Sequence, residues 1–333
     1  MRTRFVRFLR SPHTTAIMLS LLVGISIPLL HQNLVEYQKG QCEKTYTLLN
    51  PLRRCLPTPP PLKEEYDVFE KKLQSWVDEE KKNGIVTHVS IYFRDLENGP
   101  TFGIEGAESF SPASLLKVPI MLALLKQAEI EPEILSDQMS FTGPLGNYEN
   151  IQDPVHSLQS NQEYSLDELL RRMIVYSDND AKELIKLYLQ KRYPKRELVS
   201  ETYNSLGILQ REEGLDSTIG VKTYASIFRL LYNASYLSRD MSEKALNLLS
   251  QVAFKDGLVA GVPPGITIAH KFGVREGVKG QHQLHDCGIV YQPETPYLLC
   301  VMTRGLDANH NAAIIQEISR AMYEEVLRRA TTD

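Results

Sequence analysis

Residues 168–189 read ELLRRMIVYSDNDAKELIKLYL, two apolar segments on either side of a short polar turn. Apolar residues recur three and four positions apart in both segments, which predicts one helix that ends at Tyr176 and another over Ala181 to Lys191. The first helix opens on the sequence SLDE at 165–168. This is a capping box, in which a serine and a glutamate three residues apart each bond to the other's backbone N–H. The stretch therefore predicts a helix–turn–helix passage within a globular domain.

The turn between the two helices is a candidate site. Ser177, Asp178 and Asn179 are three consecutive polar residues, which serve poorly as core between buried helices. A serine hydroxyl can relay a proton, and an asparagine carboxamide can bind a substrate amide. Ser177 and Asn179 are therefore candidate functional residues.

A second candidate lies earlier, where residues 110–117 read FSPASLLK. Pro112 just ahead of an apolar helix over Leu115 to Gln127 predicts that Ser114 lies at the helix N-terminus. Unpaired backbone N–H groups there can stabilise negative charge on a substrate oxygen. Lys117 is one turn further on the same face and can reach the Ser114 hydroxyl. A partly desolvated lysine has a lowered pKa and can accept the proton. The spacing also occurs in ordinary helix caps.

The third candidate is the sequence HKFG at 270–273, which we expect to end a strand over Ile266 to Ala269. Gly273 would let the backbone approach a ligand closely. Lys271 could attract an anionic group of a substrate.

The remaining pattern predicts the fold class. A helix begins near Tyr66 and ends at Asn83-Gly84, and a helix over Ala308 to Arg328 closes the chain. Helices over Val221 to Tyr232 and Ser242 to Gln251 add to the helical middle. Alternating apolar segments predict five strands. These strands are Ile85 to Arg94, Thr101 to Ile104, Ile266 to Ala269, His285 to Tyr291 and Tyr297 to Thr303. We expect an α+β fold, with a five-stranded antiparallel sheet flanked by helices and a separate all-helical subdomain.

The three motifs, in this order, resemble the S-x-x-K, S-D-N and K-T-G set of class A β-lactamases and penicillin-binding proteins. The resemblance covers the chain from Glu64 to Asp333 and implies the β-lactamase/transpeptidase-like fold. It implies that Ser114 is the acylated nucleophile and Lys117 its base or the partner of its base. It also implies that Ser177 shuttles a proton to the leaving nitrogen.

The same resemblance assigns the binding residues. Asn179 would bind the acyl amide of the substrate, and Lys271, with Gly273, would hold its carboxylate. The oxyanion hole would consist of the backbone N–H groups of Ser114 and Val274. The substrate would be a small-molecule β-lactam or a peptidoglycan peptide, with no cofactor and no metal.

The chain departs from the family pattern in two places. Phe272 stands where the family has a threonine or serine that helps to hold the carboxylate. Arg275 is a candidate to replace that contact. No E-x-x-L-N sequence, which supplies the deacylating glutamate in class A enzymes, occurs between Asn179 and Val221. Glu212 and Glu213 are the candidate bases; alternatively, they are solvated loop charges.

Composition excludes other classes of function. The 37 Lys and Arg residues against 41 Asp and Glu give a net charge of −4, so no basic face for nucleic acid is expected. The late cluster His270, His282, His285 and Asp286 lacks the spacing of zinc ligands. We interpret these histidines as satisfied strand or surface residues.

The N-terminus predicts a membrane anchor. Four arginines precede residues 14–30, which are 17 residues without a charge. A membrane span needs about 20 residues, so this segment suffices if its flanks reach the interface. A cleaved signal peptide is the alternative, but no A-x-A cleavage box is present. We expect residues 1–30 to form a cytoplasmic tip and a single signal-anchor helix, 31–63 a stalk, and 64–333 an extracytoplasmic catalytic domain of a cell-membrane protein.

Two cysteine pairs fit an extracytoplasmic compartment. Cys42 and Cys55 in the stalk could form a disulfide or remain thiols. Two strand-like segments are symmetric about residues 293 and 294, so Cys287 and Cys300 are expected opposite each other on a hairpin, either as a disulfide or as small buried apolar residues.

Three functions follow as hypotheses. The first is a β-lactamase-like serine hydrolase that opens β-lactam amides through an acyl-enzyme at Ser114, with a role in antibiotic resistance. The second is a D-alanyl peptidase that acts on peptidoglycan peptides and is trapped by β-lactams. The third is a non-catalytic module with an eroded site that binds cell wall or a partner.

Overall fold

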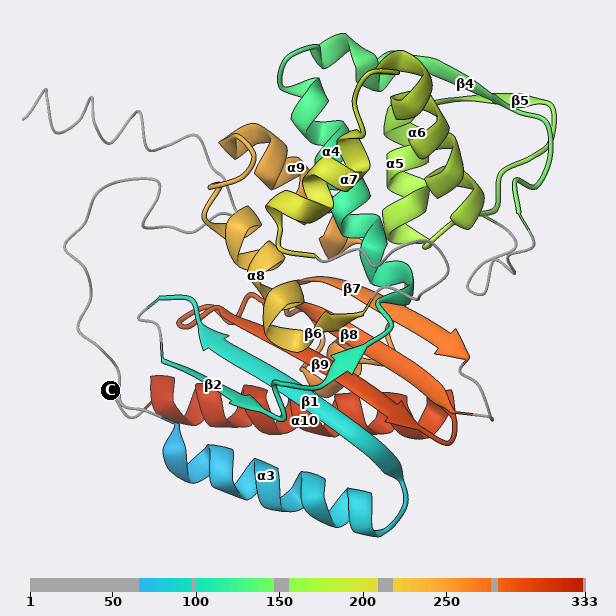
Figure 1. The fold of residues 1–333 in the computed structure, drawn as a ribbon. Helices are drawn as coiled ribbons and strands as arrows, with labels where there is room; N and C mark the ends of the chain where they lie inside the picture. The colour runs from blue at the N-terminus through green and yellow to red at the C-terminus, as the bar shows by residue number, and fades with distance from the viewer. Residues whose placement is uncertain (1–65, 98–99, 147–155, 209–217, 277–280, 332–333) are drawn as a thin grey trace, which may run out of the picture. The chain divides into compact units, whose positions relative to one another are not determined.

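The computed structural model describes residues 66–97, 100–146, 156–208, 218–276 and 281–331. Its main sheet has five antiparallel strands in the order β2-β1-β9-β8-β7 (Figure 1). The two hairpins β1–β2 and β8–β9 are joined through the β1–β9 pair, so segments from opposite ends of the chain meet in the middle of the sheet. The strands are β1 (Val86–Asp95), β2 (Thr101–Ile104), β7 (Ile268–Glu276), β8 (His282–Val290) and β9 (Tyr297–Gly305).

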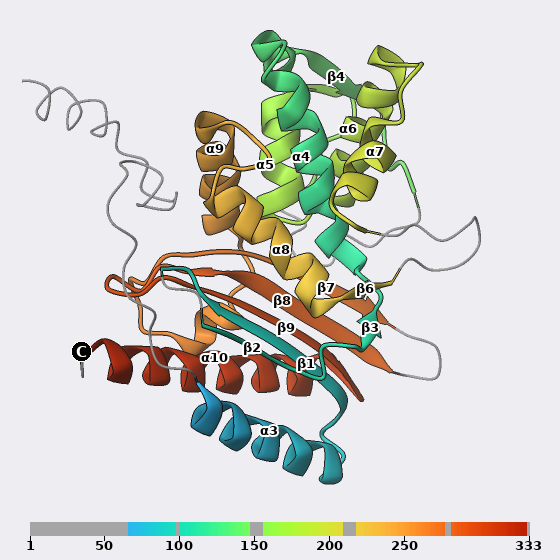
Figure 2. The same cartoon turned by 60° about the vertical axis from the view of Figure 1, so that its left-hand side comes forward.

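Two helices cover one face of this sheet. They are α3 (Asp67–Lys82) and α10 (Ala308–Ala330), which come from the two ends of the described domain and lie side by side in both ribbon views (Figures 1 and 2). α3 turns Leu73 and Val77 toward the sheet, and both are buried. Phe93 of β1 stacks on Phe102 of β2 with ring centroids 5.2 Å apart. These buried apolar contacts hold the sheet against its helices.

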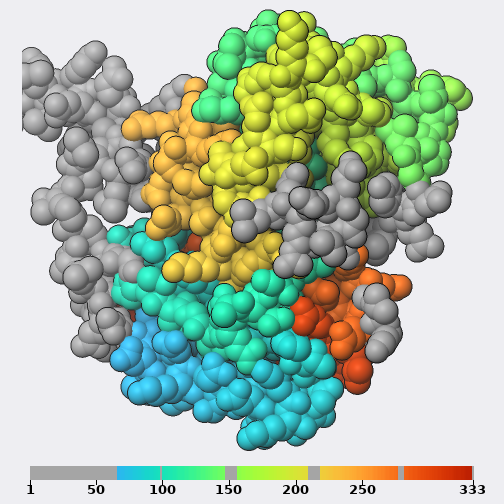
Figure 3. Space-filling model, viewed as in Figure 1, coloured from blue at the N-terminus to red at the C-terminus, as the bar shows by residue number. Residues whose placement is uncertain are grey.

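The other face carries α8 (Val221–Tyr232) and, beyond it, a helical region (Figure 2). Figure 3 shows this region, in green and yellow, stacked on the blue, teal and orange sheet region. A 3₁₀ turn over Ala113–Leu116 leads into its central helix. The helices are α4 (Lys117–Ala128), α5 (Leu166–Val175), α6 (Asn179–Arg192), α7 (Leu198–Ser205) and α9 (Arg239–Ser250).

Short elements connect these layers. Two further 3₁₀ turns span Pro132–Ser136 and Leu258–Gly261. Two small antiparallel ribbons pair β3 (Ser109–Phe110) with β6 (Ile219–Gly220) and β4 (Gln138–Phe141) with β5 (Gln162–Ser165). The β3–β6 ribbon holds the segment that enters the 3₁₀ turn at Ala113.

The helix–turn–helix passage forms as its sequence predicts. The Ser165 hydroxyl caps α5 by accepting a hydrogen bond from the Glu168 backbone N–H at 3.2 Å. Asp178 caps α6 in the same way, with 2.9 Å from the Ala181 N–H to its carboxylate. Each cap satisfies an N–H group that the helix itself cannot pair.

The predicted fold is confirmed, with one strand placed wrongly. The sequence predicted a strand that ends at Ala269, ahead of the HKFG motif. In the structure β7 runs to Glu276, and Lys271, Phe272 and Gly273 lie within it because every residue from Ile268 to Glu276 pairs with β8. The helix α7 and the two small ribbons were not predicted.

Cys287 and Cys300 face each other across the β8–β9 hairpin, as the sequence symmetry predicts. They form a disulfide, which decides between the two states that the sequence left open.

Several predictions lie outside the described residues. These concern the anchor at 14–30, the stalk with Cys42 and Cys55, and the candidate bases Glu212 and Glu213. Within the described ranges, no helix has both the length and the apolar character that a membrane span requires. The anchor, the stalk and the domain boundaries therefore stay predictions.

Candidate active site

Ser114 lies at the entrance to α4, in the 3₁₀ turn that precedes it. Its neighbour Ala113 has a φ angle of 48°, a left-handed conformation that is costly for any residue with a side chain. This local strain is held in place by the surrounding structure, and it turns the Ser114 hydroxyl toward Lys117, the first residue of α4.

Lys117 is the centre of the polar network. Its Nζ atom lies 3.1 Å from Ser114 Oγ, 3.1 Å from Ser177 Oγ and 2.8 Å from Asn179 Oδ1. The side chain is almost fully buried, and it also donates to the Ser177 carbonyl oxygen. Burial lowers the pKa of Lys117 well below its usual value, and the nearby positive charge of Lys271 lowers it further. A lysine in this state can be neutral and can accept a proton from a hydroxyl.

The SDN turn brings its residues to this lysine through its backbone. Ser177 adopts a φ angle of 57°, which reverses the chain between α5 and α6. Because Asp178 is the helix cap, Asn179 becomes the first residue of α6 and projects beside Lys117.

Lys271 approaches the same hydroxyl from the sheet. Its Nζ lies 3.0 Å from Ser177 Oγ and 3.0 Å from the Phe272 carbonyl oxygen. The side chain is fully buried, and burial lowers the pKa of Lys271 to about 7, although Asp286 opposes this change. Its ammonium also sits 3.9 Å from the ring centroid of Phe272, which stacks on Phe254. Two lysines from different layers of the fold thus share one serine.

Gly273 allows the sheet to approach the turn that holds Ser114. A Cβ atom at this position would lie 3.0 Å from the Pro112 carbonyl oxygen and 3.3 Å from the Leu115 N atom. Any side chain would therefore push β7 away from the turn that holds Ser114. The close approach is what brings the next residue, Val274, to the lining of the same cleft.

A set of contacts that the sequence did not indicate clamps the turn from the other side. Arg275 donates to the Ser111 hydroxyl at 2.6 Å, and the Ser111 backbone N–H donates to Gln283 Oε1 at 3.1 Å. His285 Nε2 lies 3.0 Å from the Ser111 carbonyl oxygen. That oxygen can only accept, so Nε2 donates the proton. Burial lowers the pKa of His285 to about 4, which keeps the imidazole neutral.

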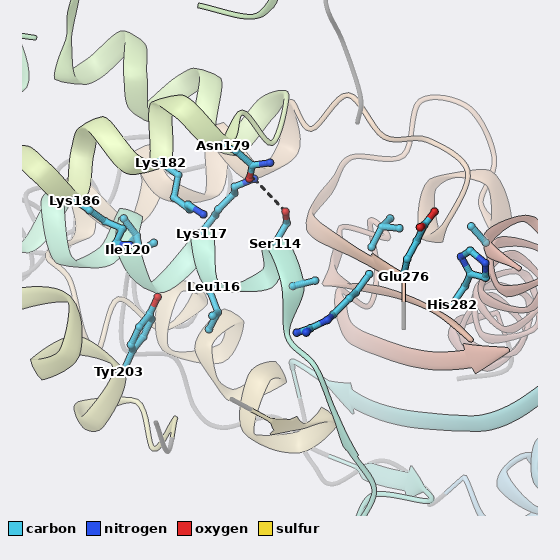
Figure 4. A pocket seen from close by; sticks show the side chains of 14 residues that line it. Ser114, Leu116, Lys117, Ile120, Asn179, Lys182, Lys186, Tyr203, Glu276 and His282 are labelled. Atoms are coloured by element: carbon cyan, nitrogen blue, oxygen red, sulfur yellow. Dashed lines mark hydrogen bonds between the residues drawn. The ribbon is translucent and has the colours of Figure 1, made fainter. Parts of the chain in front are cut away.

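Ser114 and Lys117 open onto a cleft of about 900 Å³. Figure 4 shows Lys182, Lys186 and Tyr203 on one side of Ser114, and Glu276 and His282 on the other. Sequence reasoning missed Lys182, Lys186, Tyr203 and Glu276 and took His282 for a surface or strand residue. The spacing of the two lysines from Asn179, three and seven residues, could have indicated them.

The structure therefore assembles five of the predicted site residues in one network: Ser114, Lys117, Ser177, Asn179 and Lys271. Val274 and Arg275 line the cleft beside them. Lys271 does not line it: its side chain is fully buried, with the amine against the Phe272 ring. Glu276 is the only carboxylate that lines the cleft within the described ranges, and Glu212 and Glu213 lie outside them.

Comparison with known proteins bears on the family and the fold. The model of the β-lactamase enzyme family matches residues 68–326. No curated protein matches the chain. Among solved structures, PBP-A is 20% identical over 81% of this chain and 100% of its own, with a TM-score of 0.66. A β-lactamase from Chitinophaga pinensis DSM 2588 is 18% identical over 77% of this chain and 99% of its own, with a TM-score of 0.63.

A representative of class A β-lactamase from Bacteroides cellulosilyticus DSM 14838 is 20% identical over 77% of this chain and 97% of its own, with a TM-score of 0.64. At these identities the structural likeness establishes the fold. The family match spans most of the chain, and the chain belongs to the β-lactamase enzyme family.

Proposed function

We propose that the chain is a serine hydrolase that opens β-lactam amides through an acyl-enzyme at Ser114. The observation that carries this proposal is the position of one buried amine, Lys117 Nζ, at 3.1 Å from both Ser114 Oγ and Ser177 Oγ. This places a base beside the nucleophile and a proton carrier beside the base.

The chemistry follows from these contacts. Neutral Lys117 accepts the proton from Ser114 Oγ while this oxygen attacks the carbonyl carbon of the substrate amide. The N–H groups of Ser114 and Val274 stabilise the oxyanion that forms. As the C–N bond breaks, the leaving nitrogen takes the proton of the Ser177 hydroxyl, and Ser177 recovers a proton from Lys117. The product of this half-reaction is an ester on Ser114.

The substrate groups are assigned to the residues that reach the cleft. Asn179 binds the acyl amide, because it lies at the first turn of α6 beside Lys117. Lys271 is fully buried and acts on Ser177, with its 3.0 Å contact to that hydroxyl. Arg275 lines the cleft directly after Val274 and is positively charged. We therefore propose that Arg275 binds the carboxylate of the opened ring.

Hydrolysis of the ester needs a base for the attacking water. Glu276 lies on the far side of Ser114 from Asn179 (Figure 4), so we propose Glu212 or Glu213 for this role. If neither acts, the chain would release the acyl group slowly. That behaviour belongs to the second candidate, a D-alanyl peptidase that β-lactams trap. It is favoured by the likeness to PBP-A, of which an L158E mutant is known as an acyl-enzyme complex with penicillin G.

One experiment tests both candidates. The full-length chain and Ser114→Ala are incubated with penicillin G, while intact mass and the absorbance of the lactam ring are followed. Continued ring opening supports the hydrolase, and a lasting adduct on Ser114 supports the trapped peptidase. If neither wild type nor Ser114→Ala gains mass and neither opens the ring, acylation is refuted and the non-catalytic binding module is left. Turnover that survives both Glu212→Gln and Glu213→Gln would exclude these residues as bases.

We further propose that the N-terminal segment anchors the domain outside the cytoplasm, with residues 14–30 in the cell membrane. The charge-free run behind four arginines supports this orientation. The intact protein should sediment with membranes and keep residues 1–30. A mature chain that begins after residue 30 would contradict the anchor.

A further inference from the structure

The cleft continues along one face of α6 beyond the position assigned to the acyl amide. Asn179, Lys182 and Lys186 all line it, and they are three and seven residues apart. This spacing places the three side chains on one side of a helix. At 1.5 Å per residue, Lys182 lies about 4.5 Å and Lys186 about 10 Å beyond Asn179 along the helix axis.

The walls of this part of the cleft come from other elements. Ile120 of α4 lies one turn after Lys117 and forms the opposite wall, and Tyr203 of α7 lies at the end beside Lys186 (Figure 4). The side chain of Lys182 is 19% exposed and that of Lys186 is 44% exposed. The ammonium groups are therefore partly desolvated but reachable from the cleft. We call this part of the cleft, lined by Ile120, Lys182, Lys186 and Tyr203, the acyl arm.

Two ammonium groups of the acyl arm lie beside one carboxylate in the described structure. Glu183 is the carboxylate that pairs with both lysines, at 3.0 Å from Lys182 and 3.0 Å from Lys186. Glu276 lines the cleft on the opposite side of Ser114 (Figure 4).

We propose that Lys182 and Lys186 are specificity residues that bind a carboxylate on the acyl group of the substrate, so that the preferred substrates are anionic on the acyl side. This rests on the proposed function, because Asn179 sets where the acyl group begins. From there, the acyl group extends along α6 into the acyl arm. A carboxylate about one to two helix turns past the amide meets the two ammonium groups.

The test uses two penicillins that differ in a single charge. One carries a hexanoyl group and the other an adipoyl group, which ends in a carboxylate at the distance that the acyl arm requires. The rate of adduct formation on the full-length chain is measured for each by intact mass. Because both compounds share the ring system, their rate ratio reports the acyl arm alone. It also cancels any change in Lys117, whose pKa Lys182 helps to lower.

In wild type, the adipoyl compound should react faster, and its advantage should shrink when salt is raised from 0.05 to 0.5 M, because salt screens a partly exposed charge pair. In Lys182→Met/Lys186→Met, the ratio of the adipoyl to the hexanoyl rate should fall by about five- to thirtyfold. Lys186→Met alone, at the more exposed position, should give a part of that loss. Lys191→Met, an exposed lysine further along α6, should leave the ratio unchanged.

The outcomes separate the two proposals. If both penicillins acylate Ser114 and the double variant keeps the wild-type ratio, the acyl arm does not bind a carboxylate and only this inference is overturned. If the variants slow both compounds equally, it is overturned as well. If neither compound acylates the folded wild type, the proposed function is refuted and the inference falls with it.

Discussion

Replacing Lys271 with methionine removes one of the two amines that the fold buries around Ser177, and it should change how stability depends on pH. Burial lowers the pKa of Lys271 from an ordinary value of 10.5 to about 7. Between these two values the unfolded chain holds a proton on this lysine that the folded chain has lost. Stability therefore rises with pH across this window, because the unfolded state binds more protons.

The size of the effect follows from the pKa change. The full difference of about 3.5 pH units corresponds to roughly 5 kcal/mol of unfolding free energy, present as a penalty below pH 7 and relieved as pH approaches 10.5. From pH 7 to pH 9, Lys271 should contribute about 2 kcal/mol of added stability. The pKa of Lys117 is lowered too, so this lysine adds a rise of the same sign.

Urea unfolding followed by circular dichroism at pH 7, 8 and 9 measures this dependence. Wild type should gain at least about 2 kcal/mol over the range, and Lys271→Met should lose that share of the gain while also losing most of its reactivity with penicillin G. Lys255→Met, a lysine outside the network that donates to a backbone carbonyl, is the control and should keep the wild-type slope. The burial of a proton-poor Lys271 is refuted if the unfolding free energy of wild type stays flat or falls as pH rises. It is also refuted if Lys271→Met shows the same rise with pH as wild type, because Lys271 would then not have a lowered pKa in the folded state.

Three further substitutions test the geometry. Gly273→Ala should slow acylation by about tenfold or more, because the added Cβ would press on the Pro112–Leu115 turn. The time course of adduct formation measures this rate. Gly106→Ala, at a position with open space around it, should leave the rate unchanged. Phe272→Thr should cost about 3 kcal/mol in urea unfolding, since it removes a buried ring; a neutral result would show that the ring is not packed. Cys287→Ala/Cys300→Ala should lose about 3 kcal/mol by the chain-entropy relation, whereas an unchanged melting temperature would argue against the bond.

The parts of the site that could be predicted from the sequence are those that local spacing determines. Ser114 and Lys117 are one helical turn apart, and Ser177 and Asn179 belong to one turn between two strongly patterned helices. Short-range geometry sets the spacing within each pair. The contact that brings both pairs around one Nζ atom joins residues about 60 positions apart, and the family resemblance implied it. The late hairpin with its two opposed cysteines followed from symmetry in the same way.

The parts of the fold and of the site that the sequence did not predict depend on contacts between distant segments. A lysine, a phenylalanine and a glycine after an apolar run indicate the end of a strand, yet β7 continues because β8 supplies a partner for every residue. The clamp on Ser111 joins residues more than 160 positions apart, and no local pattern encodes it. Lys182 and Lys186 look like an ordinary solvated helix face until α4 and α7 are placed beside them.

The burial of Lys271 links the departure of this chain from the family motif to its recognition of charge. The Phe272 ring, which stacks on Phe254, lies against the amine of Lys271, and burial lowers the pKa of this lysine. A lysine with a pKa near 7 that does not line the cleft is a poor partner for a substrate carboxylate, but it is well placed to influence the proton on Ser177. Under the proposed function, the cations that do line the cleft are then the better candidates to bind anionic groups. This is why Arg275 and the acyl arm, rather than Lys271, should determine which charged substrates react.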